Sequence, residues 1–165
     1  MYAPNTEEAF ERYGKSVFAA AYSLCGNSYD ANDVMQDVFF KLHCLGKGFK
    51  DSEHLKKWLI RCAVNASKNV LRSRKNKSVF TDDLPPESIR KENTVFEDER
   101  QHCLAEAVEK LPEKQRIAVH LYYYEDYSVK EIAAVTGQSE ASVKMCLSRG
   151  REKLKIVLGE EFYYD

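Results

Sequence analysis

The feature that most restricts the fold of this chain is a break at Thr136-Gly137 between two short amphipathic segments. The first segment, 128–135, has the periodicity of a helix. The second begins behind Ser139, whose hydroxyl can cap a helix by accepting from the amides of its first turn. Gly137 supplies the backbone freedom that a tight turn requires. The apolar residues with the spacing to clamp both helices together are Val129, Ile132, Ala133, Val143 and Leu147. The pattern predicts a helix-turn-helix, a motif that places its second helix in a DNA major groove.

The second of these helices also carries polar residues outside that apolar core. They follow at spacings of four, four and three residues and so share one face: Glu140, Lys144, Ser148 and Arg151. Side chains on such a face reach the base edges, where sequence is read. We therefore expect this face to bind DNA.

The rest of the chain predicts an all-α protein. Its 165 residues include only 7 Gly and 4 Pro, and alternating runs typical of strands are missing. This length suits one moderate domain or two small helical domains. No stretch approaches the length of a membrane span, and residues 1–8 are polar and acidic rather than a signal peptide. We therefore expect a cytoplasmic protein without membrane insertion.

The net charge of −1 conceals an uneven distribution along the chain. Residues 1–80 carry 13 Lys and Arg against 8 Asp and Glu, whereas residues 81–110 carry 4 against 9. Adjacent prolines and several carboxylates in the acidic segment disfavour a packed helix. We interpret it as a linker between two helical domains. A near-neutral total does not exclude nucleic acid, because binding depends on local basic surfaces.

The five cysteines are scattered and form no Cys-x-x-Cys pair, so neither a disulfide framework nor a zinc site is indicated. Adjacent His and Cys residues at 43–44 and 102–103 point about 100° apart on a helix, which disfavours a shared metal ion. We therefore expect no metal and no cofactor.

The segment 54–77 is expected to form a helix with one basic face. It contains eight Lys or Arg residues and no acidic residue. One side collects Lys57, Arg61, Asn65, Lys68 and Arg72, and the expected buried side collects Leu55, Trp58, Leu59, Cys62, Ala66 and Val70. A solvated face is the alternative, but such faces usually mix both signs of charge. We interpret the face as a phosphate-binding surface. The amides of Asn65 and Asn69 offer both donor and acceptor for base edges or an extruded base.

The segment 30–42 is expected to be a helix capped by Asp30, with Ala31, Val34, Val38 and Leu42 buried. A second face carries Asp33, Gln36, Asp37 and Phe40. Acid–base catalysis is disfavoured because no His or nucleophile is fixed beside the carboxylates. An aromatic residue among polar ones is instead a common composition of protein interfaces.

Four runs, taken in order, resemble the extracytoplasmic-function (ECF) sigma factors of bacteria, the compact branch of the sigma-70 family. They are DANDVMQDVF at 30–39, WLIRCAVN at 58–65, LPEKQR at 111–116, and the helix-turn-helix at 128–155. The resemblance implies a region 2 domain at 5–77, an acidic linker at 78–96, and a region 4 domain at 97–160. It implies a protein that binds core RNA polymerase, at the clamp coiled coil of the largest subunit and at the flap, and directs it to promoter DNA. Many relatives also bind an anti-sigma factor.

The resemblance also implies roles for individual residues. The polymerase would be bound by Asp33, Gln36, Asp37 and Phe40. The −10 element would be engaged by Phe49, in the loop 47–54, together with Lys57, Arg61, Asn65, Lys68, Asn69 and Arg72. The −35 element would be contacted by Ser139, Glu140, Ser142, Lys144, Ser148, Arg149 and Arg151.

Two other classes of protein remain as alternatives. A stand-alone helix-turn-helix regulator would account for the C-terminal third, but it would leave the basic helix unexplained. A magnesium-dependent nuclease would use Asp33 and Asp37, which lie one helical turn apart, but no third acidic ligand is evident.

Overall fold

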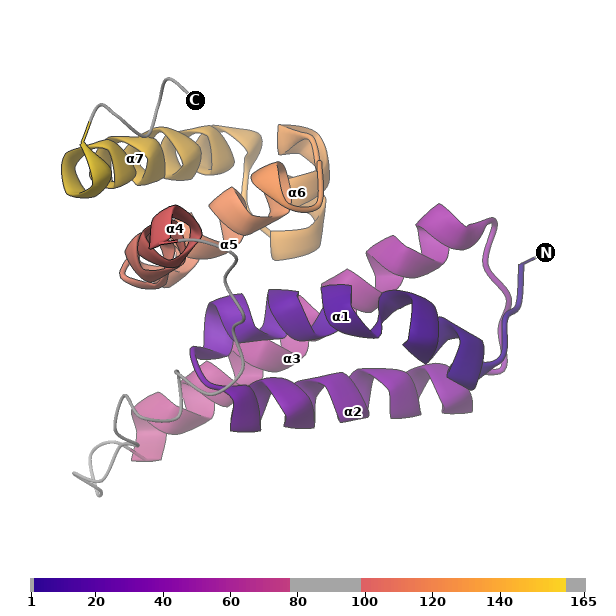
Figure 1. The fold of residues 1–165 in the computed structure, drawn as a ribbon. Helices are drawn as coiled ribbons and strands as arrows, with labels where there is room; N and C mark the ends of the chain where they lie inside the picture. Colours follow the sequence, from indigo (N-terminus) through magenta and orange to yellow (C-terminus); the bar gives the residue numbers. More distant parts are fainter. Residues whose placement is uncertain (1, 78–98, 160–165) are drawn as a thin grey trace. The chain divides into compact units, whose positions relative to one another are not determined.

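The computed structural model describes residues 2–77 and 99–159, where all regular secondary structure is helical apart from one isolated β-bridge (Figure 1). The chain divides into two compact units, Met1–Arg90 and Lys91–Asp165. The first holds α1 (Thr6–Cys25), α2 (Ser28–Leu45) and α3 (Ser52–Lys77). The second holds α4 (Glu99–Glu109), α5 (Glu113–Tyr123), α6 (Val129–Thr136) and α7 (Glu140–Leu158). The prediction of two small helical domains is confirmed for the described residues. The expected acidic linker, 78–96, lies outside them.

The N-terminal unit is a bundle in which α1, α2 and α3 each pack against the other two. Its centre is made of aliphatic side chains that are almost completely buried: Val17, Val34, Val38, Leu55, Leu59, Ile60 and Val64. Burying a side chain of this size contributes roughly 1.5–3 kcal/mol. The bundle is therefore held mainly by the apolar stripes of its three helices.

The predicted cap of α2 is wrong by three residues. The helix begins at Ser28, and its cap is Asn27 rather than Asp30, with the Asn27 side chain accepting from the Asp30 amide at 2.9 Å. Asn27 has an extended backbone, which suits a cap, whereas Asp30 already lies in the first turn. The expected buried stripe of α2 is confirmed, because Ala31, Val34, Val38 and Leu42 are all buried.

The buried stripe of α3 is also rotated from the predicted one. Leu55 and Leu59 are buried as expected, but the remaining buried positions are Ile60, Ala63, Val64 and Ser67. The residues expected in the core, Trp58, Cys62, Ala66 and Val70, are only half-buried. The prediction placed the core directly opposite the cations. The structure instead centres it where α3 meets both α1 and α2.

The C-terminal unit contains the predicted helix-turn-helix. Ser128 starts α6 with a reciprocal capping box, in which the Ser128 and Glu131 side chains each accept from the other's backbone amide. Gly137 ends α6 at a φ of 74°, and the Ser139 hydroxyl caps α7 by accepting from the Ser142 amide at 3.1 Å. Of the apolar residues predicted to hold α6 and α7 together, Ile132, Val143 and Leu147 are buried, as expected.

Gly150 allows α7 to approach α5 closely. A Cβ atom at this position would lie 3.0 Å from Val119 Cγ2 and 3.8 Å from Gln115 Cβ. The buried side chains around this contact include Ile117, Leu121 and Leu154. The absence of a side chain at Gly150 therefore sets the separation of the two helices.

We expect Gly150→Val to destabilise the C-terminal unit by about 1–3 kcal/mol, because overpacking against Val119 outweighs the small gain in helix propensity. Trp58 is the only tryptophan of the chain and lies in the N-terminal unit. In urea unfolding, the midpoint followed by far-UV circular dichroism should therefore fall, while the midpoint followed by Trp58 fluorescence stays the same. Ala141→Val, at an exposed position of α7, is the matched control. An unchanged dichroism transition in Gly150→Val would contradict the close-packing argument.

Candidate nucleic-acid interface

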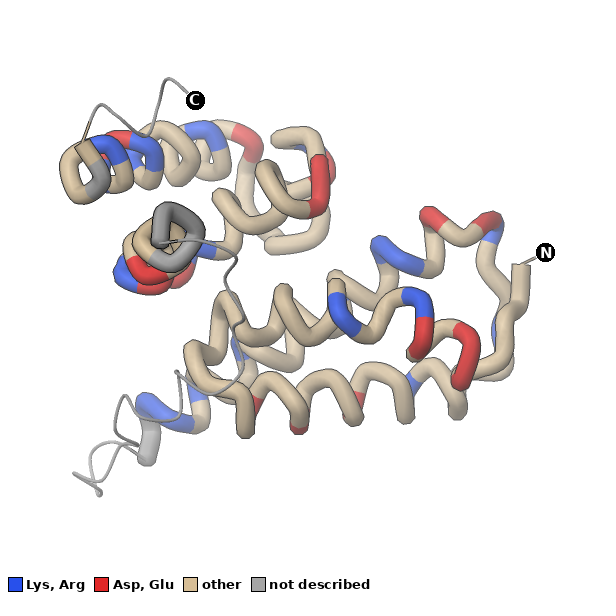
Figure 2. The backbone as a smooth tube through the Cα atoms, viewed as in Figure 1, with Lys and Arg blue, Asp and Glu red and all other residues tan. Residues whose placement is uncertain are grey.

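The polar positions of α3 are distinct from those of its buried stripe, and Figure 2 marks the lysines and arginines along the helix. Arg61, Asn65, Asn69 and Arg72 are exposed, and Lys57 and Lys68 are half-buried. Within Ser52–Lys75, the only acidic residue is Glu53, in the first turn. The helix therefore presents two amides among cations, an arrangement suited to a polyanion that also carries hydrogen-bonding groups.

Trp58 belongs to this face, although the sequence pattern assigned it to the core. It lies seven residues before Asn65 and eleven before Asn69, so the three positions follow one line along the helix. Its half-exposed ring can stack on an unpaired base, a contact that tolerates any base because each has a π-face. The spacing of Trp58 from Asn65 and Asn69 in the sequence already indicated a shared face. Trp58 was nevertheless predicted to be buried, because it is an aromatic residue beside leucines.

Phe49, which was predicted to engage the −10 element, is buried. Its side chain is only 4% exposed, and its ring centroid lies 5.5 Å from that of His54 and 5.4 Å from that of Trp58. The Phe49 amide and carbonyl also pair with those of Tyr2, with both N···O distances at 2.7 Å. Because the ring already packs on two aromatic neighbours, it cannot stack on a base without moving. It supports the loop and the Trp58 ring instead.

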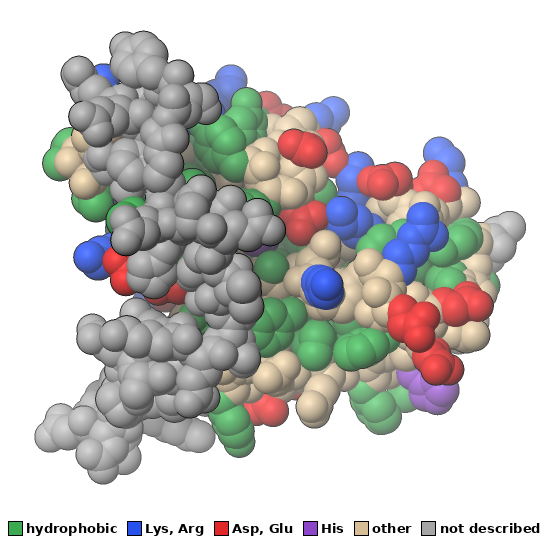
Figure 3. All heavy atoms as spheres, in the orientation of Figure 1, with side chains coloured by type: hydrophobic (Ala, Val, Ile, Leu, Met, Phe, Trp, Pro, Cys, Tyr) green, Lys and Arg blue, Asp and Glu red, His purple; other side chains and the backbone are tan. Residues whose placement is uncertain are grey.

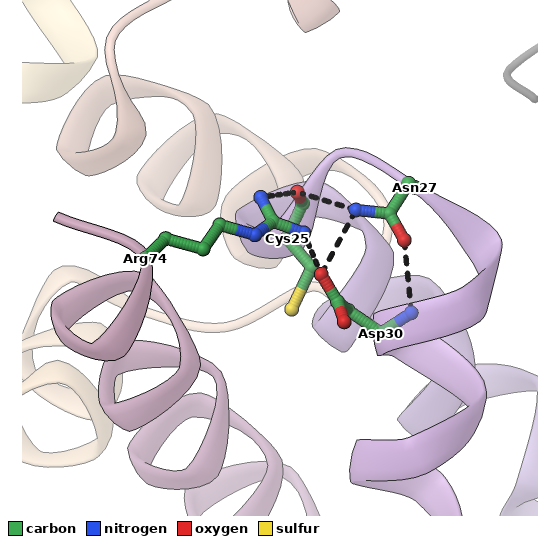
Figure 4. A network of polar contacts seen from close by, with 4 residues as sticks. All are labelled: Cys25, Asn27, Asp30 and Arg74. Carbon is green, nitrogen blue, oxygen red and sulfur yellow. Dashed lines mark hydrogen bonds and ion pairs between the residues drawn. The ribbon is translucent and has the colours of Figure 1, made fainter. Parts of the chain in front are cut away.

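A polar network anchors the C-terminal end of α3 to the turn between α1 and α2 (Figure 4). The Arg74 guanidinium pairs with the Asp30 carboxylate and donates to the Cys25 carbonyl at 2.8 Å. Asn27 Nδ2 donates to the same carboxylate at 3.0 Å. Arg74 therefore neutralises an acid and satisfies a carbonyl at the end of α1. This cation of the basic segment has a structural role.

The predicted partner-binding residues of α2 all lie on its outer face. Asp33, Gln36, Asp37 and Phe40 are exposed, with 69% of Phe40 accessible. Hydrophobic, acidic and uncharged polar side chains follow one another along the edge of the N-terminal unit formed by α2 (Figure 3). Tyr29, which is 71% exposed and four residues before Asp33, extends this face. Tyr29 is absent from the predicted set because the predicted helix began after it.

The exposed face of α7 contains most of the predicted DNA contacts. Glu140, Lys144, Ser148 and Arg149 are exposed. The Ser139 hydroxyl caps the helix, and the Ser142 hydroxyl donates to Gln138 Oε1 at 3.0 Å, so both side chains shape the N-terminal end of α7. An apolar residue absent from the prediction, Met145, is 53% exposed on this face.

Arg151, also predicted to contact DNA, binds two tyrosines of α5. Its Nε donates to the Tyr123 hydroxyl at 2.6 Å, and its guanidinium carbon lies 5.4 Å from the Tyr122 ring centroid and 5.7 Å from that of Tyr123. These contacts tie the Arg151 cation to α5. Spacing alone did not reveal the tyrosine pair that binds it.

Cys62, on α3, is half-buried. Burial raises the pKa of the Cys62 thiol, with Lys41 and Arg61 acting in the opposite direction, so the thiol stays protonated near neutral pH. Within residues 2–77 and 99–159, no group of three or more His, Cys, Asp or Glu side chains is arranged to hold a metal ion. No helix in that part of the chain is long and apolar enough to cross a membrane.

Two segments of the chain match known sequence families. Residues 9–77 match Sigma-70 region 2, and residues 101–154 match Sigma-70, region 4. The ECF RNA polymerase sigma factor SigM of Bacillus subtilis is 26% identical over 151 residues, which cover 90% of this chain and 92% of SigM. The RNA polymerase sigma factor SigZ of the same organism is 26% identical over 160 residues, covering 93% and 87%.

A solved structure shares the fold. The sigma factor RpoE, in its complex with the anti-sigma factor NepR from Bartonella quintana, superposes with a TM-score of 0.79 at 23% sequence identity. The similarity covers 93% of this chain and 96% of RpoE. Both units described above therefore have counterparts of the same architecture.

Removing the Arg74 anchor is expected to weaken the N-terminal unit. In Arg74→Met the aliphatic stem stays but the guanidinium contacts are lost, and we expect a loss of about 1 kcal/mol, because both partners keep some contact with solvent. Urea unfolding followed by Trp58 fluorescence measures this change. Arg72→Met, at an exposed position of the same helix, should shift stability by less than about 0.5 kcal/mol. Equal stability of the two variants would show that the network has no anchoring role.

Proposed function

This chain belongs to the extracytoplasmic-function group of the sigma-70 family, and from that premise we propose how its two units divide the work of starting transcription. As a sigma factor, it directs promoter-specific initiation by RNA polymerase. We assign promoter opening to a region 2 domain at 5–77 and upstream recognition to a region 4 domain at 97–160, joined by the acidic segment 78–96. The observation that carries this assignment is the occurrence of two polar helix faces, on α3 and α7, in two separate units.

The face of α3 is proposed to bind the −10 element as it opens. Arg61 and Arg72, with Lys57 and Lys68, supply charge to the phosphates, which gives affinity without sequence choice. Asn65 and Asn69 supply hydrogen bonds to exposed base edges, and Trp58 supplies a stacking surface beside them. Unstacking a base costs a few kcal/mol, which stacking and hydrogen bonds on this face offset. In this assignment Phe49 holds the loop and the Trp58 ring.

The outer face of α2 is proposed to bind core RNA polymerase. Asp33 and Asp37 supply negative charge, Gln36 supplies an amide, and Tyr29 and Phe40 supply exposed aromatic surface. Aromatic residues with charges around them are typical of specific protein interfaces. By family likeness the clamp coiled coil of the largest subunit is the partner of this face, and the flap is the partner of region 4.

The exposed face of α7 is proposed to bind the −35 element. Lys144 and Arg149 reach phosphates or guanine, and Glu140 and Ser148 add polar contacts to base edges. Ser139 and Ser142 act by shaping the first turn of the helix, which approaches the DNA. Arg151 is left out of this set because it is bound by Tyr122 and Tyr123.

Three further properties are proposed from the family. The sigma factor RpoE, whose fold is similar, was solved with the anti-sigma factor NepR, and CnrH, also of similar fold, was solved with the cytosolic domain of CnrY. We propose that an anti-sigma protein likewise restrains this chain. We also propose that this chain acts in the cytoplasm and has no catalytic activity of its own.

A stand-alone regulator is the alternative, and it would bind duplex promoter DNA strongly without polymerase. Run-off transcription with purified core enzyme and genomic fragments tests the proposal as a whole.

Reversing a charge on α2 is expected to weaken the polymerase complex. Asp37→Lys should lower affinity for core enzyme on the order of tenfold, because it brings like charges together at a complementary interface. Competition against a labelled sigma factor measures this, and the melting curve checks that the fold is intact. Glu11→Lys, an exposed charge reversal on α1, is the matched control. Equal competition by both variants would remove α2 from the interface.

Truncating a cation on α7 is expected to impair only upstream recognition. Lys144→Ala should reduce initiation on templates with a −35 element and lower the slope of log affinity against log salt by about one. Templates lacking that element should be transcribed as by the wild type. Lys153→Ala, two turns further along the helix, serves as the control. A similar loss on both kinds of template would contradict the assignment of Lys144.

A further inference from the structure

Met145 occupies the middle of the exposed face of α7. Its side chain is 53% exposed, whereas the larger apolar residues Val143 and Leu147 are buried. Residues three and four positions apart are neighbours on a helix surface. By that rule Met145 adjoins Ser148, Arg149 and Ala141, all of which are exposed. An apolar pair, Ala141 and Met145, therefore runs between the polar positions of the face.

Exposure of a single methionine is common on protein surfaces and by itself indicates nothing. The position of Met145 on α7 is what makes its exposure informative. The first two turns of the second helix are the part that approaches base edges in a helix-turn-helix. Lys144, Ser148 and Arg149 around it offer hydrogen bonds and charge. Met145 has no charge and no hydrogen-bond donor, and its thioether is only a weak acceptor, so we attribute its contribution to binding to contact with an apolar group.

The major groove contains one such group, the C5-methyl of thymine. Methionine is unbranched and adapts its shape to an irregular surface, and its thioether is polarisable. We infer that Met145 is a specificity-determining residue, which selects a T·A base pair in the −35 element through contact with the thymine methyl. This inference rests on the proposed binding of −35 DNA by α7 and names one determinant of its sequence choice.

If Met145 contacts the thymine methyl, the affinity of the holoenzyme for the −35 element depends on that single methyl group. Deoxyuridine keeps the base-pairing edge of thymidine and lacks only that methyl. The preferred −35 element is first selected from a randomised library with the reconstituted holoenzyme. Each thymidine of the selected element is then replaced by deoxyuridine, one at a time, and holoenzyme affinity is measured.

We expect one or two positions at which deoxyuridine lowers affinity about fourfold, the effect of removing one buried methyl. In Met145→Ala holoenzyme, the same replacements should have no effect. Ile156→Ala removes an apolar side chain that is 82% exposed three turns further along α7, and it should retain the full fourfold effect. Deoxyuridine placed in the spacer should leave affinity unchanged in every holoenzyme.

Three results would overturn the inference while the proposed function stands. They are a selected −35 element without a T·A pair, wild-type holoenzyme that is indifferent to every replacement, and Met145→Ala holoenzyme that keeps the wild-type sensitivity. Initiation by the wild type that ignores the −35 element altogether would overturn the role of α7 as well. The two failures are therefore distinguishable.

Discussion

The packing of α3 against α1 and α2 determines which of its residues the protein presents to a partner. Ile60, Ala63, Val64 and Ser67 are buried where the three helices meet. Because a helix is rigid about its axis, burying this stripe sets the direction of every other side chain. Trp58, Asn65 and Asn69 consequently follow one line on the outer side, bordered by exposed cations. The same packing thus stabilises the bundle and aligns the groups proposed to bind an open promoter.

Cations of similar appearance in the sequence have different roles in the structure. Arg74 neutralises Asp30 and caps the end of α1, and Arg151 is bound between α7 and two tyrosines of α5. Arg61, Arg72, Lys144 and Arg149 have exposed side chains. Arg74 and Arg151 are tied to other helices, so neither can replace counterions on DNA without breaking these contacts. The electrostatic surface is therefore smaller than the count of Lys and Arg indicates.

The turns show how small residues set the geometry of the larger elements. Gly137 ends α6 in the left-handed conformation, and the Ser139 cap fixes the first turn of α7. Gly150 then lets α7 lie close to α5, so the helix is supported along its inner side while its outer side stays open. Together these positions orient the exposed face that carries Lys144, Met145 and Arg149.

The sequence alone determined the helical class, the two-domain organisation, the helix-turn-helix with its caps, and the family. These follow from periodicity, capping residues and motif order, which act between residues close in the chain. Only the tertiary structure decided the rotation of α3, the burial of Phe49 beneath Trp58, and the internal roles of Arg74 and Arg151. Each of these depends on a partner far away in the chain, such as Tyr2, Asp30 or Tyr123, and helical periodicity carries no information about such partners.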